Sequence, residues 1–342
     1  MKTICIKDIA RESGVSITAV SLILNNKANS IPLETCERVK ETAKRLGYRP
    51  NAIASSLKTK KTKMIGYIIP SIENIFFAEI AKKVEKIVET RGYSIIICNS
   101  DDQFEKDCNS IQNLSSRMID FLLYCPSSET FKDNNLTTIH ELLRSINIPY
   151  IVIDRQIEGD IQSKVVCDDH QGGKIATEYL IQNGHKKIAC ITGPLEMSSA
   201  YNRYLGYMDA LKEHDIPYSS QYVFHGNFDF ASGYRLGKEI VQSDITAIFA
   251  NNDMMAYGAI KAIREAGKKV PQDISIVGFD DLIYSEILDV PLTTIHQDMD
   301  AIADAIGKYI MKALEEDEYE VTTQVIPSYL IERASVIKKE EA

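Results

Sequence analysis

The sequence IKDIARESGVSITAVSLIL, at residues 6–24, decides the fold of the N-terminal part of the chain. Its first eight residues place apolar side chains on one face of a short helix, at Ile6, Ile9 and Ala10. Gly14 follows where a tight turn needs a residue without a Cβ atom. Ser16 is a suitable N-cap for a second helix over 17–24. The stretch therefore predicts two short helices joined by a turn.

The second predicted helix has two faces of different character. One face packs on the first helix through Val20, Ile23 and Leu24. The opposite face points outward and carries Ile17, Thr18, Ser21 and Leu22. A third helix is predicted over 33–46 and ends at Gly47, a typical C-cap residue. Together these are the parts of a helix-turn-helix that reads DNA in the major groove.

Charge divides the chain at the same place. Residues 1–63 hold 13 basic and 5 acidic residues, whereas the rest of the 342-residue chain holds 26 basic and 43 acidic residues. A basic segment attached to an acidic body is attracted to a polyanion by electrostatic steering and counterion release. The alternative, a basic disordered tail, disagrees with the regular apolar spacing of this segment. The composition favours a nucleic-acid-binding head.

These residues resemble those of the LacI family of repressors. The resemblance is carried by residues 6–10, by Gly14-Val15-Ser16, by Thr18 with Val20-Ser21, and by residues 46–52 with Ala54 and Leu57. It implies a head at 1–50, a hinge helix and linker at 51–63, and a ligand-binding and dimerisation body at 64–342. The implied DNA contacts are Ser16, Ile17, Thr18, Ser21, Leu22, Asn51, Ala54, Leu57 and Lys58.

Two of these DNA contacts have a specific implied role. The resemblance implies that Leu22 reads the operator after Ile17 and Thr18, where an apolar contact to a thymine methyl group fits its side chain. It also implies that residues 51–57 fold as a hinge helix on the operator. Leu57 then wedges between base pairs in the minor groove and kinks the duplex. A core leucine is the alternative interpretation of Leu57.

From Met64 onward, apolar strands alternate with helical stretches. Strands are predicted at 64–69, 93–98, 121–124 and 150–153, and again from about 164, at 187–191, 222–225, 247–250 and 275–278. Helices are predicted between them, near 75–91, 103–116, 136–146, 171–183, 199–214, 231–242 and 253–266. Two such series predict two lobes, each a doubly wound parallel sheet, as in periplasmic binding proteins. Ligands of such sheets bind at the carboxyl ends of the strands.

Aromatic, acidic, basic and amide side chains follow these predicted strands. Aromatic faces stack on a sugar ring while planar polar groups bind its hydroxyls, so this set suits a small polyhydroxylated ligand. The resemblance sharpens the expectation to the pocket of ribose repressors and periplasmic ribose-binding proteins. It implies that Phe76, Phe77 and Phe228 sandwich the sugar, and that its hydroxyls bind Asn74, Asp154, Arg155, Asn252, Asp280 and Gln297.

One position departs from the ribose-type pattern. Tyr201 stands where such pockets carry a second arginine, so a related pentose or another small sugar stays open. Arg203 is expected to brace its loop rather than to touch ligand. A purine effector is less expected, because Met197 occupies the arginine position of the purine-binding branch. A purine, a sugar phosphate or a protein corepressor remain the alternative effectors.

Enzyme and transport functions are the rival classes. The first strand precedes Pro70-Ser71-Ile72-Glu73 rather than a glycine-rich loop, and no P-loop or nucleophile elbow is present, so we expect neither catalysis nor a cofactor. Seven cysteines without a C-x-x-C pair favour buried thiols in the cytoplasm over a metal site or disulfides. No apolar run is long enough to cross a membrane. The sequence predicts a cytoplasmic, ligand-responsive repressor of a sugar-utilisation operon, which binds a pseudo-palindromic operator as a homodimer.

Overall fold

The computed structural model of the chain describes residues 4–25, 28, 30–48, 61–157, 163–315 and 320–339. The chain divides into two compact units, Met1–Thr62 and Lys63–Ala342, which we call the head and the body. Within the described residues, no helix is long and apolar enough to cross a membrane.

The head contains the three predicted helices, α1 (Ile6–Ser13), α2 (Ile17–Leu24) and α3 (Leu33–Arg45). Gly14 ends α1 with a φ of 70°, in the left-handed region that glycine adopts without a steric penalty. The hydroxyl of Ser16 caps α2 by accepting a hydrogen bond from the backbone N–H of Ala19 at 3.1 Å. The three helices enclose one small core, formed by Ile9, Ala10, Val20, Ile23, Val39 and Ala43.

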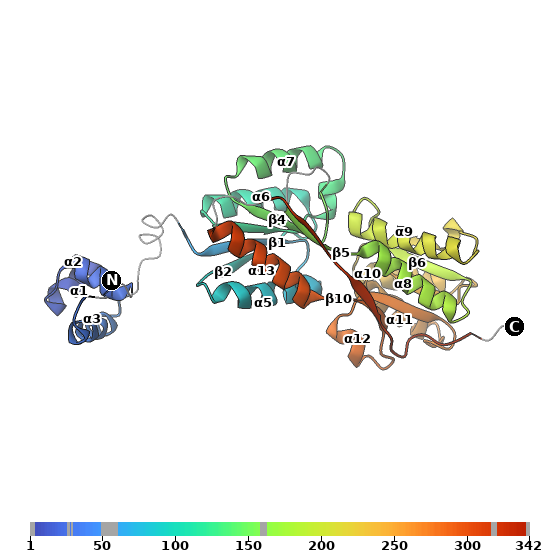
Figure 1. Cartoon of the computed structure of the whole chain (residues 1–342). Helices are drawn as coiled ribbons and strands as arrows, with labels where there is room; N and C mark the ends of the chain where they lie inside the picture. The colour runs from blue at the N-terminus through green and yellow to red at the C-terminus, as the bar shows by residue number, and fades with distance from the viewer. Residues whose placement is uncertain are drawn as a thin grey trace. The chain divides into compact units, whose positions relative to one another are not determined.

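The first lobe of the body is built on a six-stranded parallel sheet of order β11-β5-β4-β3-β1-β2. Its strands are β1 (Met64–Ile69), β2 (Ser94–Asn99), β3 (Phe121–Tyr124), β4 (Tyr150–Ile153), β5 (Ser163–Cys167) and β11 (Thr323–Ile326). One face packs against α5 (Ile75–Glu89) and α13 (Met299–Glu315). The other packs against α6 (Phe104–Ser116) and α7 (Asn135–Ser145), as Figure 1 shows.

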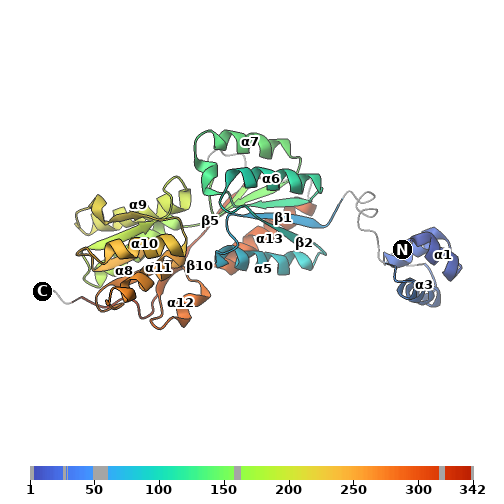
Figure 2. The ribbon, with the colours of Figure 1, turned by 180° about the vertical axis from the view of Figure 1, so that it is seen from behind.

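The second lobe repeats this design with a sheet of order β12-β10-β9-β8-β6-β7. Its strands are β6 (Ile188–Thr192), β7 (Val223–His225), β8 (Ala247–Ala250), β9 (Ser275–Asp280), β10 (Thr293–Gln297) and the antiparallel β12 (Ser328–Ile331). The pair α8 (Asp169–Gln182) and α9 (Ser198–Glu213) covers one face, and α10 (Phe230–Ile240) with α11 (Asp253–Glu265) covers the other (Figure 2). The short α12 (Ile283–Ile287) follows β9.

The predicted fold class is confirmed, a helix-turn-helix head with a two-lobed body, but the assignment of segments to lobes was too simple. The second series was expected to begin near Lys164, yet β5 pairs with β4 and β11 in the first sheet. Helix α13, which was not among the predicted helices, packs on α5 in the first lobe. Within the described residues, the chain therefore crosses between lobes three times, at 167–169, 297–299 and 326–328.

Glycines bring the helices of the second lobe into backbone contact in pairs. A Cβ atom on Gly173 of α8 would lie 2.2 Å from the carbonyl oxygen of Arg203, and one on Gly206 of α9 would lie 2.1 Å from that of His170. The pair α10 and α11 repeats the arrangement, because a Cβ atom on Gly233 would lie 2.2 Å from the carbonyl oxygen of Met255. These contacts fix the distance of each helix from its neighbour, and so the depth at which its side chains enter the space between the lobes.

We predict that Gly206→Ala destabilises the body, although alanine is favoured over glycine inside a helix by about 1 kcal/mol. The added methyl group has no space against the backbone of α8, so we expect a loss of about 2 kcal/mol in the free energy of unfolding. Urea denaturation measures it. Lys212→Ala, on the exposed face of the same helix, is the control and is expected to leave stability nearly unchanged. A Gly206→Ala protein as stable as the original would contradict the contact.

Candidate functional site

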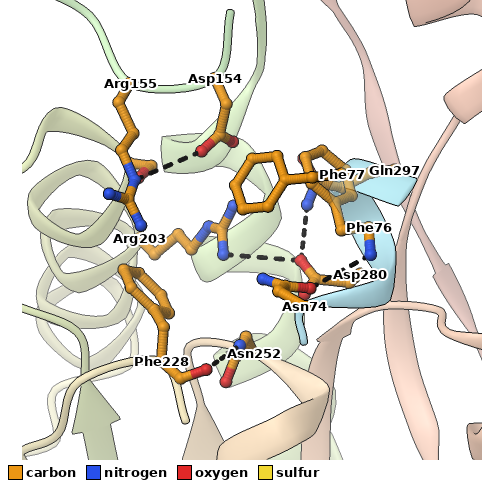
Figure 3. Close-up of a pocket in the computed structure, with 11 residues that line it drawn as sticks. Asn74, Phe76, Phe77, Asp154, Arg155, Arg203, Phe228, Asn252, Asp280 and Gln297 are labelled. Atoms are coloured by element: carbon orange, nitrogen blue, oxygen red, sulfur yellow. Dashed lines mark hydrogen bonds and ion pairs between the residues drawn. The ribbon is translucent and has the colours of Figure 1, made fainter. Parts of the chain in front are cut away.

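The carboxyl ends of the strands in both lobes face one pocket with an empty volume of about 290 Å³. The pocket lies where parallel sheets of this type bind ligands. Its lining, drawn in Figure 3, consists of Asn74, Phe76, Phe77, Asp154, Arg155, Ser199, Arg203, Phe228, Asn252, Asp280 and Gln297.

The start of helix α5 places an amide and two aromatic rings in the pocket. The side-chain oxygen of Asn74 caps the helix by accepting a hydrogen bond from the backbone N–H of Phe76 at 3.1 Å. The rings of Phe76 and Phe77 follow at once and meet edge to face, with their centres 5.3 Å apart. The capping bond therefore fixes the position of both rings relative to the end of β1.

Arg155 follows β4 and lines the pocket, and its guanidinium group is hydrogen-bonded to residues that do not line the pocket. Its Nη1 donates to the carboxylate of Asp102 at 2.6 Å and to the backbone carbonyl of Pro126 at 2.8 Å. Burial alone would raise the pKa of Asp102, but the charge of Arg155 and hydrogen bonds from Ser128 outweigh it and hold that pKa below its usual range. The carboxylate of Asp154 lies 4.0 Å from the Nε of Arg155. The guanidinium group therefore stands between two carboxylates.

Arg203 enters from helix α9 in the second lobe, and only 3% of it is exposed. Its Nε donates to the carboxylate of Asp169 at 2.7 Å, and its Nη1 donates to the backbone carbonyl of Asn251 at 2.6 Å. The guanidinium group also lies over the ring of Phe279, 3.7 Å from its centre. Burial raises the pKa of Asp169 to about 7, against the opposing effect of Arg203.

The position of Arg203 corrects the expectation that it braces a loop outside the pocket. Successive residues of an α-helix are rotated by about 100°, so residues four apart share a face and residues two apart point in nearly opposite directions. Ser199 and Arg203 both line the pocket. Tyr201 lies between them on the other side of α9, is 47% exposed, and is not among the lining residues. The second arginine of the pocket is therefore present, two residues beyond the place expected for it.

The remaining polar side chains of the second lobe are tied to one another. The side-chain oxygen of Asn252 caps α11 by accepting from the N–H of Met255, while its nitrogen donates to the backbone carbonyl of Phe228 at 2.9 Å. The Nε2 of Gln297 donates to Asp280 at 2.6 Å (Figure 3). The Oε1 of Gln297 is buried without a hydrogen-bond partner among the described residues. A buried acceptor of this kind is costly unless a ligand supplies a donor.

Three of the lining residues adopt a backbone conformation that favours glycine. The φ angles of Asp154, Phe228 and Asp280 are 65°, 63° and 112°. Such residues cost about 1–3 kcal/mol each and persist where the surrounding structure fixes them, typically at functional sites. Asp253 contributes to that fixation next to Asp280, because its buried carboxylate accepts hydrogen bonds from the N–H of Leu282 and from two hydroxyl groups. Helix α11 is capped by Asn252 and not by Asp253.

The expected DNA-reading residues of the head lie on the free face of α2. Ile17, Thr18 and Leu22 are exposed, as is the capping residue Ser16, whereas Ser21 is half-buried. The expected hinge contacts Asn51, Ala54, Leu57 and Lys58 lie outside the described residues. In the described part of the chain, no group of three or more His, Cys, Asp or Glu side chains is arranged to hold a metal ion.

Models of two protein families match the chain. Residues 5–51 match the model for bacterial regulatory proteins of the lacI family, and residues 177–336 match a periplasmic binding protein-like domain. The HTH-type transcriptional repressor PurR of Histophilus somni is 36% identical over 333 residues, which cover 96% of this chain and 98% of the relative.

Solved structures of the same family are similar over most of the chain. The lac repressor dimer bound to operator and the anti-inducer ONPF has a TM-score of 0.86 at 26% identity, covering 98% of this chain and all of that one. A LacI family regulator from Enterococcus faecium with bound ribose has a TM-score of 0.72 at 26% identity, covering 81% of this chain and all of that one. The chain therefore belongs to the lacI family of bacterial regulatory proteins, a family of DNA-binding transcriptional repressors rather than of enzymes.

Proposed function

We propose that this protein is a repressor whose binding to operator DNA is controlled by a small sugar bound between the lobes of its body. One observation carries the proposal: acidic, guanidinium and amide groups converge with three phenyl rings on a single pocket of about 290 Å³. A hydroxyl group donates and accepts at the same time, so a ring with several hydroxyls satisfies such a mixed lining. The phenyl rings of Phe76, Phe77 and Phe228 offer apolar faces to the carbon skeleton.

Ribose or a close pentose is the sugar that we favour. The objection to ribose was the tyrosine at position 201, and the presence of Arg203 in the pocket removes it. The unpartnered Oε1 of Gln297 requires a donor from the ligand, and the carboxylate of Asp154 in the lining can accept a second one. The regulator from Enterococcus faecium, which was solved with bound ribose, supports the same class of ligand at the level of the family.

A purine is the second candidate, and the curated relatives favour it over ribose. The relative from Histophilus somni and a second one from Vibrio atlanticus, 32% identical over 334 residues, are both named PurR. The phenyl rings that suit a sugar also stack on a planar base. However, Met197, which occupies the arginine position of the purine-binding branch, is 1% exposed and is not among the lining residues. The chemistry of the pocket therefore favours the sugar, whereas the sequence similarity to proteins named PurR favours the purine.

We further propose that the free face of α2 reads one operator half-site. A single head reads only half of a pseudo-palindromic site, so the repressor acts as a homodimer, like the lac repressor dimer solved on its operator. Effector and operator then change each other's affinity by the same factor, because linkage between two binding sites is reciprocal. Residues 51–57, which we propose as the hinge helix, are the segment through which the two events communicate.

The effector is expected to change the affinity for operator DNA. A duplex selected from a randomised pool, labelled with a fluorophore, is titrated with repressor alone and with D-ribose, D-xylose, hypoxanthine or guanine. We expect D-ribose or a related pentose to change the operator Kd by roughly fivefold or more, as typical coupling free energies predict. A response to purines only would keep the repressor and replace the sugar. An unchanged Kd with every compound, while one of them binds, would refute the coupling.

Substitution of Arg203 is expected to weaken effector binding, whereas substitution of Tyr201 is expected to leave it nearly unchanged. Arg203→Lys keeps the positive charge but loses the fork of donors, so we expect effector binding to weaken by about 2 kcal/mol. Tyr201→Ala changes an exposed side chain outside the lining and serves as the matched control. Calorimetric titration with the active compound measures both. Loss of binding in Tyr201→Ala and not in Arg203→Lys would reverse our assignment.

Thr18→Ala is expected to weaken specific DNA binding without affecting the fold. Thr18 is exposed on the free face of α2, so its removal leaves the core of the head intact. Base contacts specify sequence whereas phosphate contacts only position the protein, so we expect a loss of about 1–3 kcal/mol for the selected operator and little change for random DNA. Equal losses of affinity for both duplexes would indicate that Thr18 contacts the DNA phosphates and not the bases.

A further inference from the structure

Each arginine of the pocket is paired with a carboxylate that lies behind the pocket. Asp102 accepts a hydrogen bond from Arg155 at 2.6 Å, and Asp169 accepts one from Arg203 at 2.7 Å. Neither carboxylate is among the residues that line the pocket. The two pairs lie in different lobes and come from unrelated segments, so each lobe has the same arrangement of a lining guanidinium group and an outer carboxylate.

The pairs leave the pocket without net positive charge. Two guanidinium groups face four carboxyl groups, those of Asp154 and Asp280 in the lining and those of Asp102 and Asp169 behind it. Burial raises the pKa of Asp280 well above its usual range and that of Asp169 to about 7. The charge of Arg203 opposes the effect of burial on both groups. By count, four carboxyl groups stand beside two guanidinium groups, so the arginines are not left without counter-charges.

We propose that Asp102 and Asp169 make the pocket selective for an uncharged effector, by neutralising Arg155 and Arg203 from outside. The inference rests on the proposed function only in taking this pocket as the effector site. It excludes phosphorylated sugars and nucleotides as effectors, and it holds for a free sugar and for a purine base alike.

The hydrogen bonds of the two guanidinium groups support this selectivity. A phosphate group is bound by an arginine that offers two parallel donors and an uncompensated charge. Here the Nε and Nη1 of Arg203 are already engaged by Asp169 and by the backbone of Asn251. The Nη1 of Arg155 is engaged twice, by Asp102 and by the backbone of Pro126. The remaining parallel donors of Arg155 are its Nε and Nη2, and the carboxylate of Asp154, 4.0 Å from the Nε, repels an anion at that position. An anion buried without net counter-charge also carries a high desolvation cost.

Two substitutions that remove charge test the proposal, and each has a neighbouring control. Asp102→Asn and Asp169→Asn keep the size of the side chain and an oxygen that accepts the hydrogen bond. Asp101→Asn is the control for the first, because Asp101 is exposed and pairs with Lys106. Asp168→Asn is the control for the second, because Asp168 caps α8 and asparagine caps a helix equally well.

All five proteins, in full length, are titrated by calorimetry with inorganic phosphate and with D-ribose at about pH 9, above the pKa of about 7 of Asp169, so that its carboxyl group is ionised. We expect the unsubstituted protein and both controls to show no phosphate binding. Asp102→Asn and Asp169→Asn are expected to gain phosphate affinity by tenfold or more, the size of effect that follows from removing one charge a few ångströms from the guanidinium group. A merely structural defect weakens both ligands, so the ratio of phosphate to D-ribose affinity identifies the charge effect.

Phosphate binding by the unsubstituted protein as tight as its D-ribose binding would overturn the proposal. So would folded Asp102→Asn and Asp169→Asn proteins that bind no phosphate up to about 10 mM. If Asp169→Asn does not fold, Asp102→Asn decides alone, because Asp102 is half-buried and closer to solvent. If D-ribose binds none of the proteins, the proposed sugar is wrong, and the charge selectivity is then decided by the phosphate affinities of the two substituted proteins relative to their controls.

Discussion

The pocket depends on one buried guanidinium group, that of Arg203. It is held by a carboxylate, a backbone carbonyl and an aromatic ring, which come from α8, from the end of β8 and from β9. A charge buried to this extent is stable only with all of its partners in place, so their positions are tightly constrained. The backbone contacts of Gly173 and Gly206 belong to the same constraint, because they set how closely α9 approaches α8. The geometry of the second lobe is therefore linked to that of the ligand site.

Much of this architecture can be predicted from the residues alone, because it depends on local patterns. The apolar spacing of residues 6–24, with Gly14 and Ser16 between the helices, fixes two of the three helices of the head and its turn. In the body, strand–helix alternation locates most elements within a few residues. Side chains that follow strands indicate the edge of the sheets where a ligand binds, because parallel strands of one sheet end at the same edge. The family resemblance then implies nine of the eleven lining residues, six polar and three aromatic.

The parts that sequence reasoning missed depend on direction or on distance along the chain. Whether Tyr201 or Arg203 enters the pocket is decided by the rotation of α9 about its axis, which a match to a family motif does not specify. The pairing of β5 with β11 joins residues more than 150 positions apart, and no local signal marks it. Asp102 and Asp169 have no motif at all, since their role is defined only by the arginines that they contact in the folded chain.

The three crossings between the lobes also affect the order in which the protein is completed during synthesis. The first lobe takes α13 and β11 from the last fifth of the chain, after every strand of the second lobe except β12 has been made. A nascent chain that has reached residue 298 therefore carries an unfinished first lobe, with the face that later packs on α13 still exposed. The second sheet has five of its six strands at that point. The first lobe, and with it the complete ligand site, therefore forms only after α13 and β11 have been made.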